Sequence, residues 1–146
     1  NSYQHITGLP EDLHLAVKRL KHSSIETRYV GDTLQTDAQW LYIPDEQKPY
    51  HRILIRHNFC QGSRGYWLET RKERVPMYQE QAVFTYMNEY AYPLNTINKP
   101  QIMKRLLDFT SERQVYGLGR WGEHCHYNSD VVVGLAMKLS EKISHE

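Results

Sequence analysis

The segment Gly117–Gly122, close to the end of the chain, matches the glycine pattern of dinucleotide-binding loops. Such a loop follows a strand, opens a helix directly on its last glycine, and precedes an acidic residue on a second strand about 20 residues later. Val115 and Tyr116 can form the preceding strand, but the next helical pattern begins only near Ser129. The pattern therefore cannot open a nucleotide-binding domain. It predicts a closing strand, a glycine turn and a final helix that dock onto a fold begun elsewhere.

The composition is that of an ordinary globular domain. The 146 residues are 40% hydrophobic and 24% charged, enough to bury a core. The 18 lysines and arginines nearly balance the 17 aspartates and glutamates, so we expect no binding to nucleic acid or to an anionic membrane. Because the sequence has no apolar run of membrane-spanning length and no signal-peptide pattern, we expect a soluble, cytoplasmic protein. Cys60 and Cys125 fit a reducing compartment as free thiols, and a single disulfide between them is the alternative.

Hydrophobic periodicity predicts the order of the elements. A helix begins at Pro10 and ends near His22. Strands follow at 24–30, 39–43, 50–59, 66–70 and 82–92, the last of which also allows a helix, and residues 71–81 form a loop. Pro100 opens a second helix, and a short strand at 115–116 leads to a final helix capped by Asn128 or Ser129. This order predicts an α+β fold with a mainly antiparallel sheet flanked by helices.

The expected strand 50–59 has one basic face. Strict alternation places Arg52 and Arg56 on the same side of this strand, with Trp67 near them on the following strand. Such a face could hold a phosphorylated ligand, and solvated arginines are the alternative.

The segment 119–130 concentrates polar chemistry before the final helix. It contains Arg120, His124, Cys125 and His126. Free backbone N–H groups at the helix start and the Arg120 guanidinium would favour an anion such as phosphate. The alternative is that the glycines only shape a turn, while Trp121 packs and Arg120 is solvated.

We expect neither a metal nor a cysteine nucleophile in this segment. His124 and His126 would share a face of an extended chain, but a closed zinc site needs four ligands and Cys60 shows no paired spacing with them. A neighbouring cysteine and histidine on a strand point apart, which argues against nucleophilic catalysis. No catalytic residue is therefore assigned.

Several segments together resemble a known family. They are Tyr90–Leu94, Val115–Gly122 and Asn128–Val131, together with Pro49–Ile53 and Arg56–Phe59 earlier in the chain. This set resembles the C-terminal part of UDP-galactopyranose mutases and of related flavin-dependent, amine-oxidase-like proteins.

The resemblance implies two parts and a cofactor. Residues 1–113 would form a substrate-sheet domain with flanking helices, and residues 114–146 would complete a flavin-binding domain. The complete protein would hold FAD with an N-terminal half that is not in this sequence, and the isolated chain would bind FAD poorly or not at all. In the family, reduced flavin attacks the anomeric carbon of the sugar and expels UDP, and ring opening and reclosure interconvert pyranose and furanose.

The resemblance also implies roles for individual residues. Those placed near the cofactor are Gly119, Arg120, Trp121, Gly122 and Asp130. Those placed near a nucleotide-sugar substrate are Arg56, Tyr92, His126 and Tyr127. His126 departs from the family, because bacterial mutases have a diphosphate-binding tyrosine at that position.

This departure keeps two alternatives open, namely a fragment of an amine-oxidase-like oxidoreductase and a binding module without catalysis. A sheet that packs on another domain would expose apolar area, so we also expect the isolated chain to self-associate.

Overall fold

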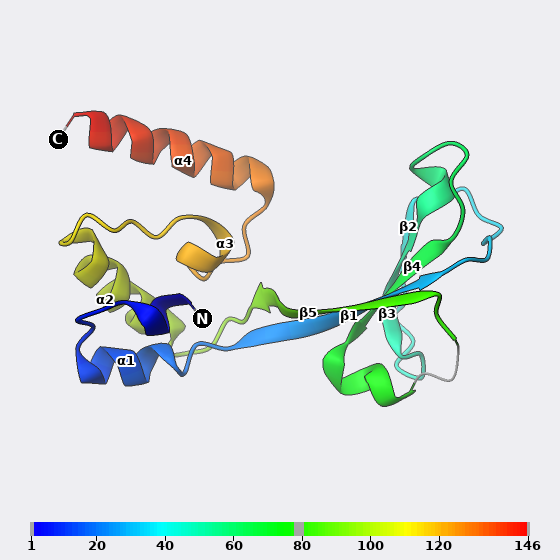
Figure 1. The fold of residues 1–146 in the computed structure, drawn as a ribbon, viewed down its shortest axis with the longest axis horizontal. Helices are drawn as coiled ribbons and strands as arrows, with labels where there is room; N and C mark the ends of the chain where they lie inside the picture. Colours follow the sequence, from blue (N-terminus) through cyan, green and yellow to red (C-terminus); the bar gives the residue numbers. More distant parts are fainter. Residues whose placement is uncertain (1, 78–80, 146) are drawn as a thin grey trace. The chain divides into compact units, whose positions relative to one another are not determined.

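The computed structural model describes residues 2–77 and 81–145 (Figure 1). Its strands are β1 (His22–Val30), β2 (Trp40–Tyr42), β3 (Tyr50–Ile55), β4 (Tyr66–Arg71) and β5 (Phe84–Pro93). Its α-helices are α1 (Glu11–Val17), α2 (Lys99–Ser111), α3 (Gly119–Gly122) and α4 (Ser129–Ser144), and its 3-10 helices are η1 (Ser2–His5), η2 (Arg56–Asn58) and η3 (Lys72–Met77). The α+β class with an antiparallel sheet is confirmed.

The chain forms two compact units. Residues 1–22 and 92–146 form one unit, which contains all four α-helices and is called the helical unit below. Residues 23–91 form the other, which contains the strands and is called the sheet unit. This division does not fall at residue 113, where the sequence places a boundary, and the proposed completion of a flavin-binding domain by residues 114–146 stays a prediction.

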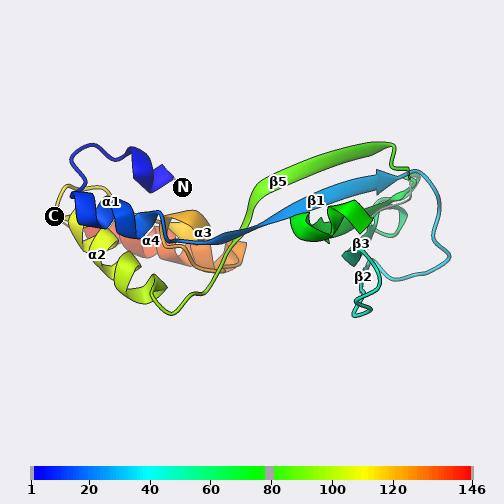
Figure 2. The same ribbon diagram turned by 90° about the horizontal axis from the view of Figure 1, so that it is seen from below.

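The sheet has five strands in the order β2-β3-β4-β1-β5. The pairs β2–β3, β3–β4 and β4–β1 are antiparallel, and β3 and β4 form the expected hairpin. Figures 1 and 2 show β1 and β5 side by side at one edge of the sheet. The expected strand at 82–92 is confirmed in this place, as β5.

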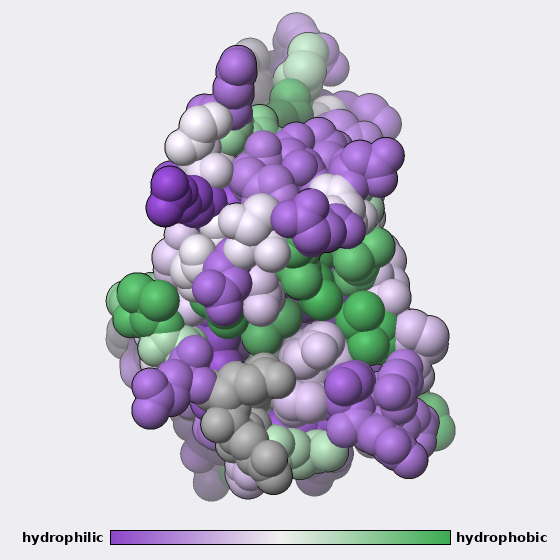
Figure 3. Space-filling view, turned by 90° about the vertical axis from the view of Figure 1, so that its right-hand side faces the viewer, coloured by the Kyte–Doolittle hydropathy of each residue, from purple (hydrophilic) through white to green (hydrophobic). Residues whose placement is uncertain are grey.

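One face of the sheet is buried. Ile53, Ile55 and Leu68 form its core, and half-buried side chains pack against them, including Leu34 and Ala38 from the segment between β1 and β2. These positions alternate with exposed or half-buried ones along β3 and β4, as expected for a sheet with one covered face. Several aromatic side chains of this unit are exposed, and the space-filling view shows apolar groups among hydrophilic ones (Figure 3).

The third strand is shorter than predicted. It ends at Ile55, and Arg56 lies in η2. The Arg56 N–H still donates to the Gly65 carbonyl at 3.1 Å, but the partner strand β4 begins only at Tyr66. The alternation of side chains in the sequence continues beyond Ile55, but β4 offers no further residues to pair with there.

The expected loop 71–81 is also wrong in part, because residues 72–77 form η3, while residues 78–80 lie outside the described residues.

The core of the helical unit lies between α1 and α2. It contains Leu13, Val17 and Leu20 from the first helical region and Ile102, Met103 and Leu106 from α2. The first helix ends at Val17, five residues before the predicted end, because two tight turns follow. The N–H of Leu20 donates to the Val17 carbonyl at 3.1 Å, so Leu20 still reaches the core before β1 begins.

The strand predicted at 115–116 is wrong. Residues 115–118 form no regular element, because the chain turns back at the end of α2. Gln114 adopts a left-handed conformation with φ 57°, and the Val115 N–H donates to the Thr110 carbonyl at 2.9 Å. This N–H is therefore used at the end of the helix, as in an αL C-cap, and not in a strand ladder.

The final helix α4 follows Asn128, which occupies the N-cap position as predicted. The helix contains no buried residue, and Val131, Val133 and Met137 are exposed. It contacts α3, and in Figure 1 the segment 112–122 lies between α4 and the α1–α2 pair. In the part of the chain that the structure describes, no helix is both long and apolar enough to span a membrane.

Candidate functional site

Four residues predicted to bind substrate or cofactor meet in the helical unit. We call Tyr92, Arg120, His126 and Tyr127 the Arg120 cluster. The Tyr92 and His126 rings stack with their centroids 4.7 Å apart and an interplanar angle of 22°. The Arg120 guanidinium carbon lies 5.0 Å from the centroid of the Tyr92 ring. The end of β5, the helical turn α3 and the loop after α3 thus contribute to one group of side chains.

Arg120 is held in place by its backbone surroundings. Its Nη2 donates to the Tyr127 carbonyl at 2.9 Å. Among residues 2–77 and 81–145, no carboxylate forms an ion pair with this guanidinium, which is half-buried. An oriented arginine without a carboxylate beside two aromatic rings is suited to bind an anionic group of a ligand.

The glycines explain how the backbone reaches this geometry. A Cβ at Gly117 would lie 2.5 Å from the Gly122 carbonyl oxygen and from the Tyr3 hydroxyl, so the two glycine backbones touch. The Tyr3 hydroxyl donates to the same Gly122 carbonyl. Gly119 has φ +77°, a conformation that favours glycine, and starts α3. The glycine pattern thus folds into a packed helical turn that presents Arg120.

His124 lies in the chain between Arg120 and His126, and its side chain is buried. Its side chain is only 4% exposed, and its Nε2 lies 3.0 Å from the Lys21 carbonyl oxygen. Burial lowers the pKa of His124, so the ring is neutral near pH 7 and donates from Nε2 to the carbonyl. Its own carbonyl accepts from Lys99 Nζ at 2.9 Å. The contacts to Lys21 and Lys99 could not be predicted from the sequence, because they join residues far apart in the chain.

The structure separates the two histidines of the His124-Cys125-His126 segment. His124 has φ +51° and points into the unit, whereas His126 is exposed and stacks on Tyr92. No group of three metal-ligating side chains occurs among the described residues. Cys125 is a free, half-buried thiol whose hydrogen bond to the Tyr127 hydroxyl raises the pKa of that phenol.

The other predicted cofactor residues have distinct surroundings. Trp121 packs edge-on against His22 and His124, with ring centroids 6.4 Å and 5.9 Å away. Asp130 lies exposed in the first turn of α4, and no hydrogen bond or ion pair joins it to Arg120 in the described ranges. The structure therefore does not bring Asp130 into the Arg120 cluster by direct contact.

The expected basic face of the sheet is not formed. Arg56 lies in η2, is exposed, and belongs to the sheet unit, whereas the Arg120 cluster belongs to the helical unit. Arg52 remains on β3, but its Nε donates to Glu69 Oε2 at 2.8 Å, which neutralises its charge. The pairing of opposite charges across β3 and β4 follows from the strand register, which places Arg52 opposite Glu69.

Comparison with solved structures finds a protein of similar fold. The chain matches a crystal structure of reduced UDP-galactopyranose mutase with a TM-score of 0.60 and 19% sequence identity. The match covers 75% of this chain and 30% of that chain. No protein-family model and no curated protein matches the chain in sequence. The resemblance inferred from the sequence is thus confirmed for the fold alone.

Proposed function

We propose that the chain is the antiparallel-sheet and C-terminal helical portion of a flavoprotein that acts on a nucleotide-sugar, as UDP-galactopyranose mutase does. The fold match supports the architecture. Because the chain spans 30% of the length of the matched structure, a flavin-binding portion would belong to the complete protein. FAD would then be held largely outside these residues.

The Arg120 cluster is the observation on which this proposal rests. It joins a guanidinium, an imidazole and a phenol ring on residues separated by up to 34 positions, from Tyr92 to His126, and the guanidinium has no carboxylate partner in the described part of the chain. A diphosphate needs such a cation, and a uracil or sugar face can pack on the Tyr92–His126 stack. We infer that Arg120 and His126 contact the diphosphate and that Tyr92 positions it.

The protein supplies binding and orientation, while the bound flavin would supply a nucleophile for the anomeric carbon of the sugar. Arg120 would stabilise the negative charge that develops on the departing diphosphate. Gly117 and Gly119 fix the turn that orients the arginine, and His124 anchors the loop leading to His126.

Titration of the full gene product with UDP tests this proposal. Replacing Arg120 by glutamine should weaken UDP binding about tenfold, the loss expected for one charge-assisted contact. Arg113→Gln is the matched control, because Arg113 also lies over an aromatic ring, that of Phe109, but outside the cluster. Equal UDP affinity of the two variants would rule out the assigned role of Arg120.

A further inference from the structure

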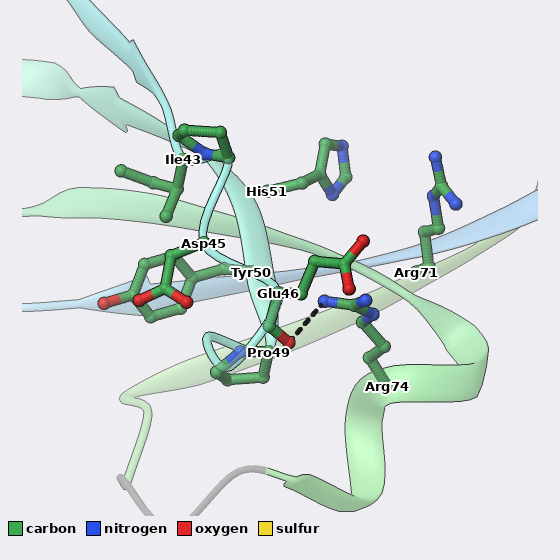
Figure 4. A pocket seen from close by; sticks show the side chains of 9 residues that line it. Ile43, Asp45, Glu46, Pro49, Tyr50, His51, Arg71 and Arg74 are labelled. Carbon is green, nitrogen blue, oxygen red and sulfur yellow. Dashed lines mark hydrogen bonds between the residues drawn. The ribbon is translucent and has the colours of Figure 1, made fainter.

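A second concentration of cationic groups lies in the sheet unit, at the end of the β2–β3 hairpin. A pocket of about 180 Å³ opens there between the hairpin, the end of β4 and the start of η3. Its polar walls include His51, Arg71 and Arg74, and Figure 4 shows these three side chains around a common space. None of them belongs to the Arg120 cluster.

Arg74 is fixed in this pocket. One of its guanidinium nitrogens donates to the Glu46 carbonyl at 3.0 Å and to the Lys48 carbonyl at 3.2 Å. These two bonds use neutral acceptors, so they orient the guanidinium without cancelling its charge. Arg71 is exposed and forms no ion pair within the described ranges 2–77 and 81–145.

His51 contributes a buried polar atom without a partner. Its Nδ1 is buried and has no hydrogen-bond partner among the described residues. An orphaned buried nitrogen costs free energy unless a ligand or water satisfies it. Burial lowers the pKa of His51, and the positive charges of Arg52, Arg71 and Arg74 lower it further against the opposing effect of Glu69. Arg71 and Arg74 line the same pocket as this ring, so an anion bound beside it would have two guanidinium groups within the pocket.

The carboxylates of the pocket occupy different places. Figure 4 shows Asp45 turned toward Tyr50, away from the two arginines. The Glu46 carboxylate points into the space between Arg74 and His51, yet no ion pair fixes it there in the described part of the chain. An exposed glutamate on a hairpin loop can leave this space at little cost.

We propose that this pocket binds a phosphate group, held by the guanidinium groups of Arg71 and Arg74 and by the imidazole Nδ1 of His51. Phosphate offers several acceptor oxygens in a tetrahedral arrangement, which suits donors that converge from three directions. The ligand takes the place of the Glu46 carboxylate. The sheet unit thus has an anion site of its own, in addition to the proposed nucleotide-sugar site of the helical unit.

The test is titration of the 146-residue protein with inorganic phosphate and with glycerol 3-phosphate, followed by calorimetry and by the NMR signals of His51. Arg71→Gln should weaken phosphate binding about tenfold. Arg64→Gln, which removes the same charge from an exposed turn of the same unit, should leave it unchanged. Tighter binding of glycerol 3-phosphate than of inorganic phosphate would support a phosphate ester as the ligand, and equal binding would support free phosphate.

Glu46→Gln provides a second variant on an exposed loop position. It removes the competing carboxylate and should strengthen phosphate binding several-fold. Absence of saturable binding by both the native protein and Glu46→Gln would overturn the proposal. Equal losses in Arg71→Gln and Arg64→Gln would also overturn it, because binding would then depend only on net charge.

Discussion

At the scale of single residues, close contacts decide which glycines are essential. The Gly117 position has no room for a side chain, since an added Cβ would lie 2.5 Å from the Gly122 carbonyl oxygen and 2.6 Å from Leu107 Cδ2. Gly134, inside α4, has nothing within 4 Å of an added Cβ. The same substitution should therefore have opposite effects at these two positions.

Gly117→Ala should destabilise the protein by about 1–3 kcal/mol, the usual cost of overpacking. Gly134→Ala should instead stabilise it by up to about 1 kcal/mol, because alanine has the higher helix propensity. Thermal unfolding followed by circular dichroism measures both effects. A loss of stability in Gly134→Ala, or none in Gly117→Ala, would contradict the packing described for this turn.

The buried imidazole of His124 predicts a pH dependence of stability. Burial lowers its pKa below the ordinary value of 6.5 in the folded protein. Below that pH the unfolded chain binds a proton that the folded protein does not, so the free energy of unfolding should fall as the pH drops below about 6.5. Above that pH, His124 should contribute no pH dependence.

His124→Asn separates this effect from that of His51, whose pKa is lowered in the same direction. Asparagine tolerates the left-handed backbone of this position but does not titrate. Urea unfolding at several pH values should show a smaller loss of stability on acidification in the variant. An identical pH profile in both proteins would mean that His124 is not the titrating group.

At the scale of elements, most helices and strands followed from periodicity, whereas their ends depended on partners. Alternation in 50–59 predicted a strand, but it does not indicate where the opposing strand begins, so the end at Ile55 was missed. The segment after α2 has strand-forming residues, but the N–H of Val115 is already bonded to the Thr110 carbonyl. Sequence patterns show which side chains are apolar or polar. Both errors instead depend on the hydrogen-bond partners of backbone groups, which these patterns do not reveal.

The same limit applies to the candidate sites. The chemistry of Arg120 and of the glycines was visible in the sequence, but the stacking of His126 on Tyr92 required the fold. The contribution of Lys99, which donates to the His124 carbonyl, had no sequence signal. The pocket beside His51 was not predicted either, because it is formed by a hairpin end and η3, a segment expected to be a loop.

The core between α1 and α2 gives a prediction for the helical unit. Leu106 is completely buried, so Leu106→Ala should destabilise this unit by about 2–5 kcal/mol. Ile97, which is 98% exposed, is the matched control, and Ile97→Ala should change stability by less than about 0.5 kcal/mol. Urea unfolding monitored by the fluorescence of Trp121, with Trp40 and Trp67 replaced by phenylalanine, measures both. Similar effects of the two variants would be inconsistent with the described core.

At the scale of the whole molecule, α4 leaves apolar side chains exposed. Val133 and Met137 are 60% and 62% exposed on a helix without any buried residue. Exposed apolar area of this kind favours association with another surface. We expect the isolated 146-residue protein to self-associate through this helix.

The double variant Val133→Glu and Met137→Glu should shift the isolated protein toward monomer in sedimentation velocity. Ser140→Glu adds charge at an exposed polar position of the same helix and should leave the association unchanged. A native protein that stays monomeric at high concentration would show that the helix needs no partner.

The flavin content of the full gene product is the most direct test of the proposed function. We expect the purified protein to show the visible absorbance of bound flavin, and the isolated 146-residue chain to lack it after incubation with FAD. UDP should change that flavin spectrum in the native protein and much less in Arg120→Gln. A full gene product that purifies without flavin and takes up none from solution would contradict the assignment to this class of flavoproteins.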